Sequence, residues 1–91
     1  MFYTYVLSCR NSKTGFQRFY VGFTEDLRTR LRRHTTKGST FTKAFDKVDL
    51  VYYEACLSEV DARNRELQLK TGFGRAYIKR RMVDYLRELR D

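Results

Sequence analysis

Two of the residues best suited to chemistry lie on the apolar side of a predicted helix near the N-terminal third of the chain. This helix is expected to begin at Thr24, where a threonine precedes an acidic first turn. At ~100° per residue, Arg30 and His34 fall on the same side as Leu27 and Leu31. An arginine on a core-facing side must extend out along its stem, pair with a buried carboxylate or line a cleft.

A carboxylate on a later predicted helix has the same unexpected placement. Glu66 lies on the side formed by Ala62, Leu69 and Phe73, and not on a fully solvated face. A salt bridge between Arg30 and Glu66 is the plain structural explanation for both side chains.

Phosphodiester cleavage is the second explanation for these residues. An arginine can stabilise charge on phosphoryl oxygens. One glutamate, together with water and phosphate oxygens, suits the coordination habits of Mg²⁺. A strand tyrosine or His34 could activate a water or protonate the leaving oxygen. Spacing alone does not choose between the salt bridge and the catalytic site.

The elements that position these residues follow from the hydrophobic pattern. Aromatic and β-branched runs predict strands over residues 2–9, 18–24 and 49–55. Gly22 inside the second strand indicates a bulge or a close backbone approach. Helices are expected from Thr24 to about residue 34, from Ser58 to about Thr71 with Gly72 just past its end, and over residues 75–89. The order β-β-α-β-α-α predicts a small α+β fold with helices on a short sheet.

Charge is concentrated on the first helix and the loop after it. The 91 residues carry 19 Lys+Arg against 11 Asp+Glu, a net charge of +8, and we expect one domain over residues 1–91. A cationic side suits a phosphate backbone, although a solvated charged face is the common alternative. The residues expected to bind nucleic acid are Arg28, Arg32, Arg33, Lys37 and Lys43.

Several protein classes are excluded by composition. No apolar run approaches the ~20 residues of a membrane span, so no membrane partner is expected. The first residues lack the pattern of a signal peptide, which favours a cytoplasmic location. Cys9 and Cys56 have no neighbours at metal-ligand spacing and are expected to be reduced and partly buried.

Four segments resemble the GIY-YIG nuclease family in order and spacing. They are residues 3–7 (YTYVL), 19–24 (FYVGFT), 26–34 (DLRTRLRRH), and 50–54 (LVYYE) followed by 62–75. The resemblance is to the small stand-alone bacterial members, which are related to the N-terminal nuclease domain of a bacterial excinuclease and to some homing endonucleases. The first segment lacks the Gly-Ile of the family motif, and Phe23 stands where the repair-enzyme domain tends to carry lysine.

The resemblance implies a three-stranded antiparallel sheet flanked by helices and the hydrolysis of DNA phosphodiesters. It implies an endonuclease that uses one divalent ion, Mg²⁺ or Mn²⁺, with Glu66 as the metal-binding residue. Such an enzyme would act in DNA repair, recombination or DNA processing. The catalytic residues implied by the matching positions are Tyr5, Tyr20, Arg30, His34 and Glu66.

Other interpretations remain open at this stage. Tyr5 and Tyr20 could be ordinary cross-strand aromatics, and His34 could cap a helix C-terminus. The chain could be a nucleic-acid-binding module without catalysis, or a catalytic cassette that needs a protein partner for targeting. The sequence does not distinguish single-stranded, duplex and branched DNA as the substrate.

Overall fold

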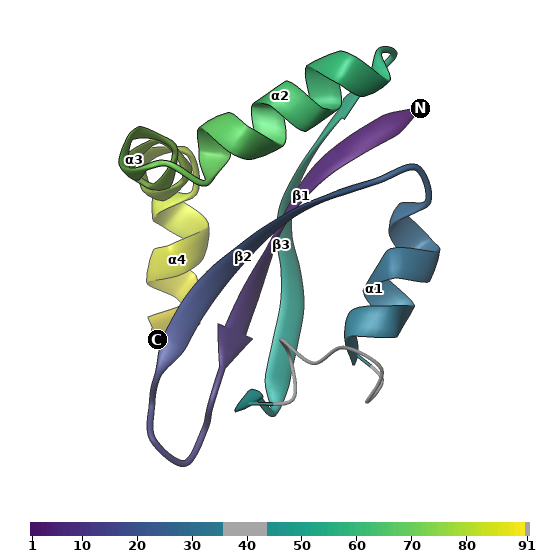
Figure 1. Cartoon of the computed structure of the whole chain (residues 1–91). Helices are drawn as coiled ribbons and strands as arrows, with labels where there is room; N and C mark the ends of the chain where they lie inside the picture. Colours follow the sequence, from purple (N-terminus) through teal and green to yellow (C-terminus); the bar gives the residue numbers. More distant parts are fainter. Residues whose placement is uncertain (36–43, 91) are drawn as a thin grey trace.

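The fold is a three-stranded antiparallel sheet with helices on both faces. The computed structural model describes residues 1–35 and 44–90, and the side chains of residues 34, 35, 89 and 90 lie outside this description. The strands β1 (Phe2–Arg10), β2 (Gln17–Thr24) and β3 (Lys47–Cys56) are arranged in the order β2-β1-β3. The described residues also form α1 (Leu27–Thr35), α2 (Glu59–Leu69), α3 (Gly72–Arg81) and α4 (Val83–Arg90). Figure 1 shows α1 on one side of the sheet and the other helices on the opposite side.

Alternation along the central strand β1 divides the core into two clusters. Successive side chains of a strand point to opposite faces of the sheet. Tyr5, Leu7 and Cys9 therefore share the face covered by α1, and they pack with Leu27 and Leu31 of that helix. The opposite face carries the second cluster, which consists of Val6, Val21, Leu69, Ile78 and Met82.

The first helix begins later than the sequence predicted. The carboxylate of Asp26, not the hydroxyl of Thr24, accepts hydrogen bonds from the Thr29 N–H (3.1 Å) and the Thr29 hydroxyl (2.8 Å). These bonds hold the pKa of Asp26 below its usual range. Thr24 is buried and bonds instead with the backbone of Asp26, so it fixes the turn between β2 and α1.

A carboxylate–guanidinium pair joins α2 to the edge strand β3. Arg65 donates from Nε to Glu54 Oε1 (3.0 Å) and from Nη2 to Glu54 Oε2 (3.0 Å). Tyr52 donates to the same carboxylate at 2.9 Å, and the Arg65 guanidinium lies 4.7 Å from the centroid of the Tyr77 ring. The cluster therefore connects β3, α2 and α3.

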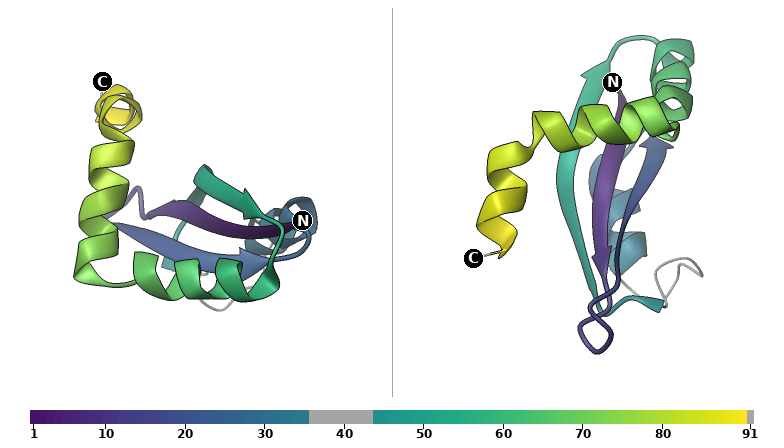
Figure 2. Two further views of the ribbon diagram at one scale, coloured as in Figure 1. Left: turned by 90° about the horizontal axis from the view of Figure 1, so that it is seen from above. Right: turned by 90° about the vertical axis from the view of Figure 1, so that its left-hand side faces the viewer.

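The transition from α2 to α3 also differs from the prediction. Gly72 is not the residue past the end of α2 but the first residue of α3, whose N-cap Thr71 accepts from the Gly74 N–H at 3.1 Å. A Cβ at Gly74 would lie 2.3 Å from the Gln68 carbonyl oxygen, so the two helices meet where position 74 has no side chain. Figure 2 shows the resulting turn between α2 and α3.

The last predicted helix is observed as two helices. The chain breaks at Met82, whose φ of −113° and ψ of 27° depart from helical values. Its N–H still bonds to Ile78 (3.0 Å) and its carbonyl accepts from Leu86 (2.9 Å), so the apolar stripe continues across the break. The predicted class, an α+β fold with a three-stranded antiparallel sheet, is confirmed.

Candidate active site

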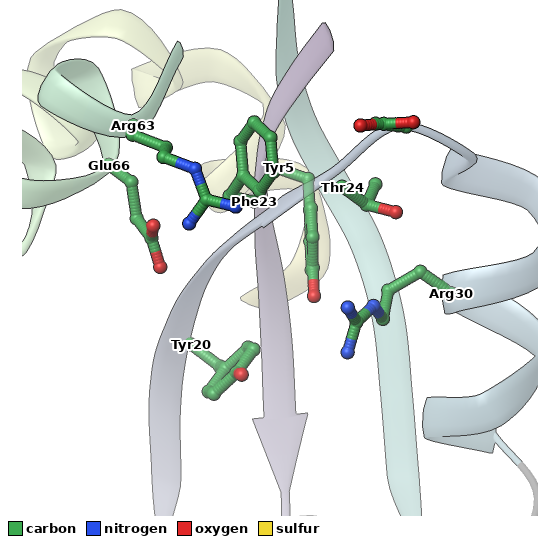
Figure 3. A pocket seen from close by; sticks show the side chains of 8 residues that line it. Tyr5, Tyr20, Phe23, Thr24, Arg30, Arg63 and Glu66 are labelled. Carbon is green, nitrogen blue, oxygen red and sulfur yellow. The ribbon is translucent and has the colours of Figure 1, made fainter. Parts of the chain in front are cut away.

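A polar pocket lies beside the edge strand β2, where side chains from the sheet and from two helices meet. Its volume is about 390 Å³. Four of the five predicted catalytic residues line it, each from a different element: Tyr5 of β1, Tyr20 of β2, Arg30 of α1 and Glu66 of α2. Figure 3 shows Glu66 and Arg30 on opposite sides of the pocket with Tyr5 between them. The fold thus brings together residues that lie far apart in the chain.

Tyr5 reaches the pocket because its neighbour on β2 has no side chain. Tyr5 is paired with Gly22 in the antiparallel register. A Cβ at position 22 would lie 2.4 Å from both Cζ and Oη of Tyr5, a distance that no packed structure allows. The close approach predicted from Gly22 is therefore the approach of the Tyr5 ring. The Tyr20 ring lies on the same face, with its centroid 6.3 Å from that of Tyr5.

The surroundings of Tyr5 keep its phenol protonated. Tyr5 is 1% exposed, and burial is the main cause that raises its pKa well above the usual range. Tyr20 raises it further, the positive charge of Arg30 acts in the opposite direction, and the negative charge of Glu66 raises it again. The hydroxyl of Tyr5 therefore senses both charged residues, and at neutral pH it carries its proton.

Arg30 and Glu66 are both partly buried, as their helical positions predicted, but they do not form the salt bridge. Among the described ion pairs, the partner of Glu66 is Lys70, whose Nζ lies 2.9 Å from Glu66 Oε2. The Glu66 side chain is 19% exposed and that of Lys70 is 49% exposed. Phe73, which the sequence placed on the same side, is 73% exposed because α2 ends before it.

Arg63 is a pocket residue that the sequence interpretation missed. It precedes Glu66 by one helical turn, and both side chains line the pocket. Its guanidinium carbon lies 4.3 Å from the centroid of the Phe23 ring. Arg63 lies three positions before Glu66 on one helix, and this spacing could have predicted that the two side chains share a face.

The remaining predicted site residues are the five nucleic-acid-binding cations and His34. Arg28, Arg32 and Arg33 are exposed on α1, on the side away from the leucines. Lys37 and Lys43 lie outside the described residues, and so does the side chain of His34, although position 34 falls within α1.

Comparison with known proteins identifies the family. Residues 1–86 match the model described as the GIY-YIG catalytic domain. The chain belongs to the GIY-YIG family. Its fold is therefore of the nuclease type, as the motifs in the sequence suggested.

Curated relatives of this GIY-YIG chain are bacterial UPF0213 proteins. That of Streptococcus pneumoniae serotype 4 is 38% identical over 69 residues, which cover 75% of this chain and 65% of the relative. That of Bacillus pumilus is 32% identical over 89 residues, 97% of this chain and 81% of the relative. That of Pediococcus pentosaceus is 37% identical over 70 residues, 76% and 68% respectively. The match thus spans a little under two thirds of the Streptococcus protein. No solved structure matches the chain significantly.

The GIY-YIG family typically uses a divalent metal ion, and the side chains of the pocket can be compared with what such ions require. Among the described side chains, those of residues 1–33 and 44–88, no three His, Cys, Asp or Glu are grouped as a metal site. A cage for Zn²⁺ or Ca²⁺ needs such a group. Mg²⁺ keeps several waters and is bound by one or two carboxylates with substrate phosphates. Two carboxylates line the pocket, those of the half-buried Glu66 and the exposed Glu25, and this number meets the requirement.

In the part of the chain that the structure describes, no helix is long and apolar enough to cross a membrane. Cys9 and Cys56 are free thiols, Cys9 buried and Cys56 partly buried, as expected.

Proposed function

We propose that the protein is a divalent-metal-dependent endonuclease that hydrolyses phosphodiester bonds of DNA. The observation that carries this proposal is the convergence of Tyr5, Tyr20, Arg30 and Glu66 on one pocket. These residues come from four elements, and their chemistry covers the needs of phosphodiester hydrolysis. Membership of the GIY-YIG family supports the same reaction class.

The charged residues of the pocket would bind and polarise the scissile phosphate. Glu66 would hold the divalent ion, which when bound supplies positive charge to the phosphoryl oxygens. Arg30 approaches from the opposite side of the pocket and would donate hydrogen bonds to the same oxygens as their negative charge develops. Because both side chains are partly buried, their charges act through less water than surface charges do.

The two tyrosines would divide the work of positioning and proton transfer. Tyr5 keeps its proton, so it is suited to donate a hydrogen bond and unsuited to act as a base. Tyr20 is half-buried on the same face, and we assign to it the role of the base that takes the proton from the attacking water. His34, one helical turn after Arg30, would position or share that proton.

The exposed arginines of α1 would strengthen DNA binding without making it specific for a base sequence. Arg28, Arg32 and Arg33 are exposed on the helix that carries Arg30. Contacts of this kind to phosphates fix position on the nucleic acid but do not read its bases. A DNA preference would then come from strand structure or from a targeting protein partner.

A non-catalytic nucleic-acid-binding module is the second candidate, and one contact favours it. The carboxylate of Glu66 already has an ion-pair partner in Lys70, at 2.9 Å. A binding module would keep this ion pair and require no metal. A nuclease would exchange the ion pair for the divalent ion.

Incubation with labelled single-stranded, duplex and branched DNA tests the proposal. Each substrate is exposed to the protein with Mg²⁺, with Mn²⁺ and with EDTA. We expect cleavage of at least one substrate with a metal ion and none with EDTA. Salt-sensitive binding of all substrates without cleavage under any condition would instead support the binding module.

A further inference from the structure

Arg63 supplies a second positive charge to the pocket, on the side opposite to Arg30. Both arginines line the pocket, and Figure 3 shows their guanidinium groups on either side of Tyr5. The mechanism above uses Arg30 and leaves Arg63 without a role. A cation beside a half-buried carboxylate would serve as its salt-bridge partner in an ordinary structure, but the ion-pair partner of Glu66 is Lys70.

An aromatic platform holds the Arg63 guanidinium. Its central carbon lies 4.3 Å from the centroid of Phe23. Phe23 is itself stacked on Phe2, with centroids 6.3 Å apart and rings within 12° of parallel. Stacking on a fixed ring restricts the planar guanidinium and leaves its N–H donors at the edge of the plane. Arg63 is thus more ordered than its exposure alone would suggest.

The acidic neighbour of Arg63 does not neutralise it strongly. Arg63 Nη2 lies 3.5 Å from Glu59 Oε1, and the two side chains are 59% and 46% exposed. Solvent-exposed pairs one helical turn apart are worth only about 0.3–0.5 kcal/mol. A phosphate with accessible oxygens can therefore replace Glu59 as the partner.

We propose that Arg63 binds the phosphate adjacent to the scissile one, so that the pocket reads two consecutive phosphates of a nucleic-acid strand. The inference rests on the proposed function, in which Glu66 and Arg30 take the scissile phosphate. The side of the pocket around Phe23 then belongs to the flanking phosphate. The favoured ligand is a polynucleotide strand and not a single phosphate ester.

Binding measured in EDTA tests this role without cleavage. The affinity of wild type and Arg63→Ala for a labelled duplex is measured by fluorescence anisotropy between 50 and 200 mM salt. One lost phosphate contact lowers the slope of log affinity against log salt by about 0.9. Wild-type affinity should therefore fall about 3.5-fold more than that of Arg63→Ala across this range. An unchanged slope overturns the proposal.

Three comparisons separate a phosphate contact from a general loss of charge or of structure. Arg87→Ala removes an exposed arginine that is likewise paired within its own helix, with Asp84 at 3.9 Å, and should leave the slope as in wild type. Arg63→Lys keeps the charge and should restore the slope. Phe23→Leu removes the platform and should weaken binding without changing the slope. An equal fall in slope for Arg87→Ala would overturn the assignment.

A neutral methylphosphonate at the flanking position identifies the phosphate that is bound. If Arg63 contacts that phosphate, the methylphosphonate and Arg63→Ala together should weaken binding no more than either change alone. Additive losses would overturn the flanking-phosphate assignment. The salt-slope test in EDTA is independent of catalysis: a wild type that binds but never cleaves would contradict the proposed function and leave a phosphate contact of Arg63 standing.

Discussion

The ring of Tyr5 occupies the space that a side chain at position 22 would need. Tyr5 and Gly22 are paired across β1 and β2, and a Cβ on Gly22 would lie 2.4 Å from the Tyr5 hydroxyl oxygen. The glycine therefore determines where the phenol lies relative to Arg30 and Glu66. A residue without any functional group thus helps to set the geometry of the pocket.

Gly22→Ala should disturb both stability and catalysis. The added methyl group meets the far end of a buried ring, and overpacking of this kind costs about 1–3 kcal/mol of unfolding free energy. Displacement of Tyr5 should also slow DNA cleavage. Gly72→Ala is the matched control, because nothing lies within 4 Å of a Cβ there. Urea unfolding of both variants checks the prediction, and equal stabilities would contradict it.

Tyr5→Phe should reduce the loss of unfolding free energy that the protein shows at alkaline pH. Burial raises the pKa of Tyr5, so above about pH 10 the unfolded chain loses this proton while the folded chain keeps it. The contribution of Tyr5 to the free energy of unfolding is therefore intact below pH 10 and is lost as the pH rises above it. Burial likewise raises the pKa of Cys9, to about 11, and that of Tyr52, so the variant should retain some of the fall.

Urea unfolding between pH 8 and pH 11 measures this effect. Tyr53→Phe serves as the control, because it removes the same hydroxyl group from a tyrosine that is 53% exposed. An identical loss of stability with pH in wild type and Tyr5→Phe would show that the Tyr5 phenol is not buried in solution.

Arg30→Ala and Arg28→Ala should separate catalysis from attraction. Removing a donor that stabilises charge in the transition state typically lowers kcat by about 10²–10³-fold. Arg28 is exposed on the same helix, so its loss should weaken DNA binding and lower the salt slope by about 0.9 with little change in kcat. Single-turnover cleavage and anisotropy measure the two effects. Equal loss of kcat in both variants would contradict the placement of Arg30.

Arg65→Ala should affect stability much more than the chemical step. Its guanidinium joins α2 to β3 through paired hydrogen bonds with Glu54, and the side chains are 27% and 31% exposed. Hydrogen bonds to charged groups contribute about 1.5–3 kcal/mol, so the melting temperature should fall by roughly 6–24 °C. Arg87→Ala, whose exposed pair spans 3.9 Å, should cost less than about 0.5 kcal/mol. Similar melting temperatures for the two variants would contradict this role.

Periodicity predicted the sheet and the sides of the helices because both follow from local sequence. The alternation of Tyr5, Leu7 and Cys9, and the placement of Arg30 and Glu66 toward the sheet, depend only on residue spacing. The start of α1 was misplaced because Thr24 and Asp26 are both good caps. Which of the two residues caps the helix depends on the burial of Thr24, and burial is set by tertiary packing.

Features that depend on packing between elements were not visible in the sequence. The break at Met82 occurs without proline or glycine, in a continuous apolar stripe. The ion pair between Glu66 and Lys70 was not predicted, because the sequence allowed a pairing of Glu66 with Arg30 equally well. In the sequence Arg63 looks like any exposed helix arginine, and only the structure shows it against Phe23 at the pocket.

Glu66→Gln tests the central claim most directly, because it removes the negative charge of the proposed metal ligand and keeps the shape of the side chain. Cleavage of a labelled DNA substrate is followed in single turnover while Mn²⁺ is titrated, with thermal unfolding as the control for the fold. We predict metal-dependent cleavage by wild type and its loss in Glu66→Gln, with the melting temperature nearly unchanged. Metal-dependent cleavage by Glu66→Gln at the wild-type rate would contradict the account.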